Sequence, residues 1–205
     1  MVKEPTLFID LNALAHNYRV LRQQLYADTK FLAVVKASSY GHAPGPVAQK
    51  LVDLGVDYFG VAYALEGAEL RAAGISTPIL LLHPMAAHFE QILAYNLEPS
   101  LYSVSLMRQW IDFLESKNIT DYPVHLKFNS GLNRLGMNFE EITEVVSAIL
   151  GTNSLRICSV FSHLGASDDP NAEEFTRDQI TRYDSFYETF TEKMRDKNPL
   201  FNNPW

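Results

Sequence analysis

The fold of this chain is decided by Phe31-Leu32-Ala33-Val34-Val35-Lys36, a run of five apolar residues that ends in a lysine. The run has no polar alternation, which is typical of a parallel strand buried on both faces. Small and polar residues follow at once, as Ala37-Ser38-Ser39-Tyr40-Gly41-His42. A buried strand that leads directly into chemically capable side chains predicts an α/β fold whose functional groups follow its strands.

The same unit, a short apolar strand followed by an amphipathic helix, recurs along the chain. Strands are predicted at 31–35, 58–62, 78–82, 99–102, 124–128 and 157–161, with a further edge strand at 6–9. Helices are predicted at 11–25, 46–54, 64–73, 86–95, 104–116, 138–150 and 170–195. Gly55, Gly74 and Gly151 are placed to end three of these helices. Alternating strands and helices indicate a parallel sheet.

Two architectures fit these strand–helix units: an open doubly wound sheet and a (β/α)8 barrel. The turn after the strand at 31–35 lacks G-x-G-x-x-G, which weakens the dinucleotide-binding form of the open sheet. Several strands are followed by a chemically capable residue, as at the C-terminal face of a barrel. These residues are Lys36, Tyr63, His83, Asn129 and His163. We therefore predict an α/β, TIM-type barrel that is incomplete, because the six units seen in the sequence are two short of eight.

Composition narrows the class of protein and its partners. The net charge of −7 argues against a nucleic-acid surface, and no block of Lys and Arg offers one locally. The longest apolar stretches, such as 78–82, are too short to span a bilayer, and the N-terminus lacks the apolar segment of a signal peptide. The single Cys158 fits a reducing compartment, and in its apolar run it is expected to be a small buried residue rather than a nucleophile. We expect a cytoplasmic protein without nucleic-acid or membrane partners.

Lys36 is the sharpest candidate for chemistry. A lysine that ends a buried strand is partly desolvated, which disfavours the ammonium and leaves the neutral amine that Schiff-base formation requires. The alternative is a charge that simply reaches solvent at a strand end. Tyr40 offers a hydroxyl to a phosphate and His42 a second polar group, while Gly41 permits a tight turn. Without Lys36, the same Tyr40 and His42 are an ordinary loop aromatic and a histidine near a helix start.

A second cluster lies in and after the strand at 124–128. His125, Lys127 and Asn129 alternate with apolar residues and so share one face, which points inward in a barrel. Basic groups inside a core need anionic partners or an aqueous site. Arg134 follows in a glycine-containing loop, where its guanidinium is able to clamp a carboxylate or a phenolic oxygen. The alternative is a half-exposed edge strand with solvated basic residues.

A third cluster follows the strand at 157–161. His163 stands where a barrel places functional groups, although taken alone it is better explained as a structural histidine. Asp168 and Asp169 precede Pro170, and acids before a helix are more often caps than a metal pair. We predict no metal site.

These clusters resemble the motifs of one family. Ala33-Val34-Val35-Lys36-Ala37 followed by Tyr40-Gly41-His42 is similar to the cofactor-lysine motif of alanine racemases, the fold-type III pyridoxal-phosphate enzymes. The stretch from His125 to Gly136 resembles their second motif, H-x-K-x-D-T-G-M-x-R-x-G, and the stretch from Phe161 to Asp168 resembles their third. The opening from Thr6 to Asn17 is similar to the family's N-terminal segment.

The resemblance implies a cofactor, a reaction and residue roles. Lys36 would form the internal aldimine of pyridoxal phosphate and act as one of two bases that interconvert L- and D-alanine for peptidoglycan precursors. Tyr40 would contact the cofactor phosphate, and His163 would join the hydrogen bonds behind the pyridine ring. Arg134 would bind the phenolic oxygen and lie near the substrate carboxylate. Lys127 corresponds to a lysine that is carbamylated in some members and positions that arginine.

The chain also departs from the family pattern. Ser38-Ser39 stands where Asn-Ala is usual, Asn129-Ser130 replaces Asp-Thr, and Leu132 replaces Met. The family's last two barrel strands and its C-terminal β domain, which carries the second base across a homodimer, have no counterpart in residues 1–205. We therefore expect residues 1–205 to be a truncated N-terminal barrel domain. Activity as a fragment, a non-catalytic remnant and another amino-acid racemase stay open. A single-barrel pyridoxal-phosphate protein is a further alternative, against which the cluster from Lys127 to Arg134 argues because it matches the racemase pattern more closely.

Overall fold

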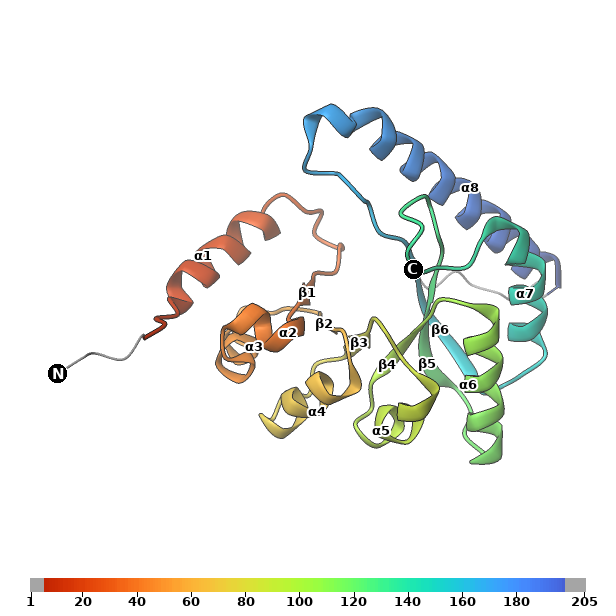
Figure 1. Ribbon diagram of the computed structural model, residues 1–205, viewed down its shortest axis with the longest axis horizontal. Helices are drawn as coiled ribbons and strands as arrows, with labels where there is room; N and C mark the ends of the chain where they lie inside the picture. Colours follow the sequence, from red (N-terminus) through yellow and green to blue (C-terminus); the bar gives the residue numbers. More distant parts are fainter. Residues whose placement is uncertain (1–5, 198–205) are drawn as a thin grey trace. The chain divides into compact units, whose positions relative to one another are not determined.

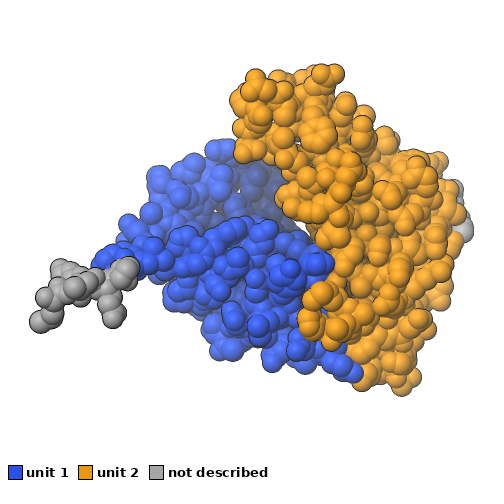
Figure 2. Space-filling view, in the orientation of Figure 1, with its two compact units in different colours: residues 1–83, 90–97 blue, residues 84–89, 98–205 orange. Residues whose placement is uncertain are grey.

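The computed structural model describes residues 6–197, which form parallel strands alternating with helices (Figure 1). The chain divides into two compact units, coloured separately in Figure 2. The described part of unit 1 is residues 6–83 and 90–97, and that of unit 2 is residues 84–89 and 98–197. Each unit is a short parallel sheet with its helices.

Unit 1 holds strands β1 (Leu32–Val34), β2 (Tyr58–Val61) and β3 (Ile79–Leu81), paired in parallel in this order. Its helices are α1 (Leu11–Arg22), α2 (Lys36–Gly41), α3 (Pro44–Asp53) and α4 (Ala64–Ala72). The 3-10 helix η1 (Ala86–His88) belongs to unit 2, and α5 (Phe89–Ala94) lies almost wholly in unit 1. Strand β3 is buried along its whole length, as its continuous apolar sequence requires.

Unit 2 holds strands β4 (Glu98–Leu101), β5 (Tyr122–Lys127) and β6 (Leu155–Phe161), again parallel and in sequence order. The helical elements after β4 are α6 (Val104–Ser116), η2 (Phe139–Glu141), α7 (Ile142–Leu150), η3 (Pro170–Ala172) and α8 (Glu173–Lys197). Helix α7 packs against the long helix α8 (Figure 1). Aromatic rings join the helices to the sheet, since Trp110 of α6 meets Tyr122 of β5 edge-on and Phe128, directly after β5, stacks on Phe186 of α8.

The predicted strands and helices are confirmed within a few residues, with three corrections. Residues 6–10 form no strand, and Phe8 is 89% exposed. In the described chain β1 pairs only with β2, so residues 6–9 do not add a further strand to the sheet. The prediction that 31–35 is buried on both faces is wrong for Val34, which is 41% exposed. Helix α1 ends at Arg22 rather than at the predicted residue 25, and both Leu21 in its last turn and Leu25 beyond it are exposed.

Over residues 6–197, none of the helices combines the length and apolar character that crossing a bilayer requires.

Candidate active site

Lys36 lies directly beyond the last ladder contact of β1. The Val35 N–H donates to the Gly60 carbonyl of β2 at 2.9 Å, so the pairing extends to the residue before the lysine. Val35 is buried and Lys36 is half-buried, so the stem of the lysine leaves the sheet at its carboxyl end. The predicted position of Lys36 at a strand end is confirmed.

The residues after Lys36 form a left-handed turn. Ala37, Ser38, Ser39 and Tyr40 have φ between 51° and 57°, and Gly41 follows at 85°. The left-handed conformation costs residues other than glycine roughly 1–2 kcal/mol each. Strain of this kind persists only where the surroundings hold it, and it concentrates at functional sites. Sequence reasoning predicted a tight turn at Gly41 and missed the four residues before it.

Local hydrogen bonds close this turn. The Ser39 N–H donates to the Val35 carbonyl at 3.0 Å, and the His42 N–H donates to the Ser38 carbonyl at 3.0 Å. The His42 ring places Nδ1 2.8 Å from the Ser39 carbonyl, so Nδ1 carries the proton and donates. Tyr40 is 60% exposed, which leaves its hydroxyl accessible to a ligand. His42 is thus a cap of the turn.

The carboxylate of Glu66 in α4 contacts the same turn. Oε1 accepts from the Ala37 N–H at 2.8 Å, while Oε2 accepts from the N–H groups of Ala62 and Tyr63 at 2.7 and 3.2 Å. One side chain therefore joins the segments that follow β1 and β2. Sequence reasoning missed Glu66, because position 63 is a tyrosine and the usual Ser/Thr-x-x-Glu capping signature is lacking.

Tyr63 and His83, which follow β2 and β3, are the other two predicted residues of unit 1. Their rings lie 5.6 Å apart between centroids, and Tyr63 is 46% exposed. Since β2 ends at Val61 and β3 at Leu81, the predicted positions of Tyr63 and His83 after strands are confirmed.

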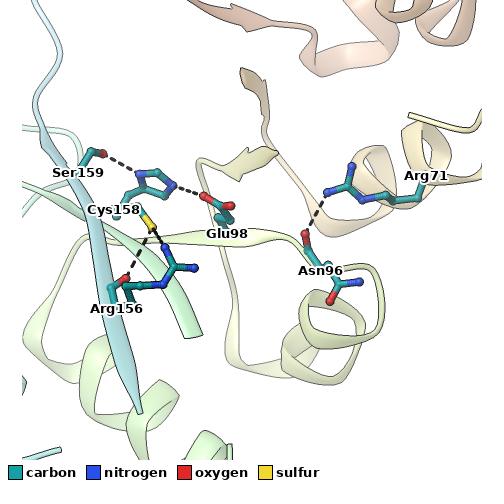
Figure 3. Close-up of polar contacts among 7 residues, drawn as sticks. Arg71, Asn96, Glu98, Arg156, Cys158 and Ser159 are labelled. Atoms are coloured by element: carbon teal, nitrogen blue, oxygen red, sulfur yellow. Dashed lines mark hydrogen bonds and ion pairs between the residues drawn. The ribbon is translucent and has the colours of Figure 1, made fainter. Parts of the chain in front are cut away.

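In unit 2, the buried His125 contacts two half-buried residues, Glu98 and Ser159, which are labelled in Figure 3. His125 Nε2 is 2.8 Å from Glu98 Oε2, and its Nδ1 is 2.6 Å from Ser159 Oγ. His125 is only 4% exposed, so the expectation that an inward basic residue needs an anionic partner is confirmed here.

Lys127 lies two residues further along the same face of β5. It is 6% exposed, and its Nζ is 5.6 Å from the centre of the Phe161 ring on β6, within cation–π range. Burial of both His125 and Lys127 rules out the alternative of an edge strand with solvated basic residues.

Asn129 organises the loop that carries Arg134. Its Oδ1 accepts from the N–H groups of Gly131 and Asn133 at 3.1 and 3.0 Å, and its Nδ2 donates to Asn133 Oδ1 at 2.9 Å. The loop closes where the Asn129 N–H donates to the Met137 carbonyl at 2.9 Å. Arg134 itself is exposed, so its guanidinium is presented to solvent from a tied loop.

His163 follows β6 and is held through its backbone. Gln179, 1% exposed on α8, donates from Nε2 to the His163 carbonyl at 3.2 Å and accepts from the Gly165 N–H at 2.8 Å. A cavity of about 270 Å³ lies beside this loop. It is lined by Ser130, Val160, Phe161, Ser162, His163, Leu164, Gln179, Ile180 and Tyr183. Gln179 was missed because a polar residue inside a charged helix carries no sequence signal.

The ends of β5 and β6 are tied by two serines. Ser162 Oγ donates to the Phe128 carbonyl at 2.9 Å, and the Ser130 hydroxyl lies 2.7 Å from Ser162 Oγ. Since Ser162 has used its proton, Ser130 is the donor in this second bond. Ser130, one of the departures from the motif, therefore contributes directly to the order of this edge.

Cys158 and the acidic pair have structural surroundings. Burial, and next the negative charge of Glu98, raise the pKa of the Cys158 thiol, which opposes a role as nucleophile. Asp169 Oδ1 accepts from the Asn171 N–H at 2.9 Å and so caps η3, as the capping interpretation expected. Within residues 6–197, no group of three His, Cys, Asp or Glu side chains is arranged to hold a metal ion.

The candidate residues thus fall into two sets. Lys36 directly precedes the left-handed turn of unit 1 and Tyr40 lies in it, while Lys127, Arg134 and His163 follow or end strands of unit 2. Residues 9–201 match the family described as alanine racemase, N-terminal domain. The chain belongs to the alanine racemase family.

Individual alanine racemases agree with this assignment. The chain is 38% identical to the alanine racemase of Synechocystis sp. over 83% of its length, and 40% identical to that of Nostoc sp. over 80%. These matches cover 46% and 43% of the two relatives, so the chain spans about half the length of the curated relatives it matches.

Solved alanine racemase structures share the fold. The enzyme of Clostridium difficile 630 in complex with cycloserine superposes with a TM-score of 0.83 at 29% identity, covering 89% of this chain and 50% of that one. The Bartonella henselae enzyme with covalently bound pyridoxal phosphate gives 0.79 at 26% identity, covering 88% and 52%. The predicted fold class is confirmed: an α/β fold of the TIM-barrel type, present as an incomplete set of strand–helix units.

Proposed function

We propose that this chain is the cofactor-binding barrel part of an alanine racemase, with Lys36 as the lysine that holds pyridoxal phosphate. One observation carries the proposal: Lys36 ends a paired strand and opens a strained left-handed turn. Membership of the alanine racemase family and the Bartonella henselae relative with covalently bound cofactor support it.

The residues present suit pyridoxal phosphate. Lys36 is half-buried and supplies the amine, Tyr40 presents a phenol four residues away, and Arg134 presents a guanidinium that pairs with anionic oxygens. We assign Tyr40 to the phosphate, Arg134 to the phenolic oxygen and the substrate carboxylate, and His163 to the hydrogen bonds behind the ring. Buried Lys127 stands where some members carry a carbamylated lysine.

The chemistry divides between the cofactor and this chain. Pyridoxal phosphate, when bound, supplies an aldehyde that condenses with a lysine amine, releasing water, and a conjugated ring that accepts the electrons left when a Cα proton is removed. With the cofactor held at this site, Lys36 Nζ would be the base that takes or returns that proton on one face. Arg134 orients the carboxylate of the substrate. We propose alanine as the substrate.

Several wider assignments belong to the same proposal. The opposing base, the remaining barrel strands and a homodimer are contributions expected of a protein with the full length of the relatives, and residues 1–205 are its N-terminal barrel domain. A role in supplying D-alanine to the cell wall, in the cytoplasm, completes the proposal.

Cofactor attachment is tested by borohydride trapping. Pyridoxal phosphate is added to the chain, borohydride reduces the carbon–nitrogen double bond, and peptide mass spectrometry locates the stable pyridoxyl group. We expect it on Lys36, and we expect Lys36→Ala to abolish it. Lys30→Ala is the matched control, because Lys30 is exposed just before the same strand and should have no effect. Labelling spread over surface lysines, with Lys36 unmodified, would refute the assignment.

Turnover is tested separately from attachment. A coupled assay for D-alanine, run on the chain alone and on a protein with the full length of the relatives, distinguishes a barrel that racemises from one that only binds the cofactor. Trapping on Lys36 without D-alanine formation in either protein would favour the alternative, a cofactor-binding protein of the same fold.

A further inference from the structure

We propose that Glu66 is a positioning residue that fixes Lys36 by clamping the left-handed turn to the neighbouring strand end. The proposal rests on the proposed role of Lys36. Glu66 touches neither the amine of Lys36 nor any group assigned to the cofactor, and it acts through the backbone of Ala37, the residue bonded to Lys36.

The geometry of the clamp uses the two carboxylate oxygens for two different segments. Oε1 accepts from the Ala37 N–H at 2.8 Å after β1, and Oε2 accepts from the Ala62 N–H at 2.7 Å after β2. The Tyr63 N–H adds a longer contact of 3.2 Å to Oε2, which caps the start of α4. An ordinary capping glutamate satisfies the start of its own helix, so the contact to Ala37 is the unusual one.

The helix that carries Glu66 is itself held in place. The Arg71 guanidinium of α4 donates to the carbonyls of Ile75 and Thr77, both at 2.8 Å, and to those of Tyr95 and Asn96, both at 3.0 Å (Figure 3 shows the Asn96 contact). Leu70 of the same helix is 2% exposed. A fixed helix gives Glu66 a fixed position, so its bond to Ala37 restrains the turn.

The turn needs such a restraint. Ala37 is the first of four consecutive residues at left-handed φ, a conformation that alanine and serine adopt only when the surroundings enforce it. Relaxation of Ala37 would rotate the peptide bond next to Lys36 and redirect the lysine stem. The carboxylate is required in full, because both of its oxygens accept, whereas an amide has one acceptor oxygen and an aspartate is one methylene shorter.

The test compares Glu66→Gln and Glu66→Asp with a matched control, Glu141→Gln. Glu141 Oε2 accepts from the Asn138 N–H at 2.6 Å in the same capping arrangement, but it bridges no second strand end in the described structure. Amide hydrogen exchange in peptides covering residues 32–42 measures the protection of the turn in the absence of cofactor. The rate of pyridoxal-phosphate attachment to Lys36, followed by borohydride trapping, reads the position of the lysine.

We expect Glu66→Gln to speed amide exchange at Ala37 about tenfold, because the variant loses one hydrogen bond to a charged group. We also expect it to slow the attachment of pyridoxal phosphate to Lys36 severalfold. We expect Glu66→Asp to keep the hydrogen bonds to the N–H groups of residues 62 and 63 but to lose the bond to the Ala37 N–H, so exchange at Ala37 should still be faster. Because aspartate keeps the negative charge, this variant distinguishes loss of the bridge from loss of the charge. Glu141→Gln should change exchange only around 138–142. Should Glu66→Gln fail to fold, the aspartate variant carries the same comparison.

The outcomes separate the two proposals. If the unaltered chain fails to label at Lys36, the proposed function fails, while the exchange data still test the clamp. If the unaltered chain labels and both Glu66 variants match it in exchange at 37–42 and in attachment rate, the positioning role is overturned.

Discussion

Gly136 has a backbone conformation that residues with a Cβ adopt only under strain. Its φ is +138°, and a Cβ at this position would lie 2.6 Å from the Asn129 nitrogen and 2.6 Å from the Phe128 carbonyl carbon. We expect Gly136→Ala to destabilise the chain by about 2–4 kcal/mol, since the clash is with backbone that cannot rotate away. Urea denaturation followed by circular dichroism measures the change.

Gly151→Ala is the control for that substitution. Gly151 has an ordinary φ of −82°, and its added Cβ would meet the Ser147 carbonyl oxygen at 3.2 Å. A small effect at 151 together with a large one at 136 is expected. Equal effects at the two glycines would contradict the claim that backbone contact at Gly136 holds the loop of Arg134.

Cys158 provides a prediction on pH. Burial raises the pKa of its thiol, Glu98 raises it further, and Arg156 opposes them. A raised pKa means less thiolate at any given pH, so alkylation by iodoacetamide should reach half its maximal rate at a higher pH than it does for the same cysteine in urea-unfolded chain. Coincident pH profiles for folded and unfolded chain would contradict the burial argument.

At the scale of single elements, α4 depends on Arg71. Its guanidinium reaches four carbonyls in two segments, and a lysine ammonium at one point cannot reproduce that fork. We expect Arg71→Lys to lower the free energy of unfolding by about 1–3 kcal/mol. Arg108→Lys, at a surface pair with Glu144 in which the arginine side chain is 62% exposed, should change it by less than about 1 kcal/mol. An equal loss in both variants would show that Arg71 acts only as a surface charge.

The elements themselves could be predicted because their signals are local. Helix α6 begins and ends at the predicted residues, with Ser103 accepting from the Leu106 N–H at its start, and Gly55 and Gly74 adopt the left-handed φ expected after α3 and α4. The prediction of a strand at residues 6–9 was wrong because a strand needs a partner strand, which local composition does not reveal. The left-handed turn was not predicted because alanine and serine disfavour that conformation, and the tertiary contacts that enforce it are not visible in the local sequence.

At the scale of the whole molecule, the edges of the sheets predict association. In residues 6–197, β1 pairs only with β2 and β6 only with β5, so each has one edge that no further strand covers, although the Tyr183 hydroxyl donates to the Val160 carbonyl of β6. Such edges template pairing between chains. We expect sedimentation velocity of the 205-residue chain to show mass rising with protein concentration. A single monomeric species with cooperative unfolding would contradict this expectation.

The candidate site was predictable in part at this scale. Lys36 and Arg134 could be found because a motif places each one after a strand, and the surrounding residue types match the chemistry. Glu66 and Gln179 could not, because each acts on backbone that is distant in sequence, Ala37 in one case and His163 in the other. Contacts from a side chain to remote backbone leave no pattern in a single sequence.

The left-handed turn inverts the usual rule for glycine substitution. Replacing Ala37 by glycine removes a steric penalty in the folded chain and adds freedom to the unfolded one, so the two effects oppose each other instead of adding. Mirror-image building blocks give a cleaner answer: a D-alanyl residue at position 37 favours this φ and gains no unfolded freedom. A semisynthetic chain that carries it should be more stable than the natural one.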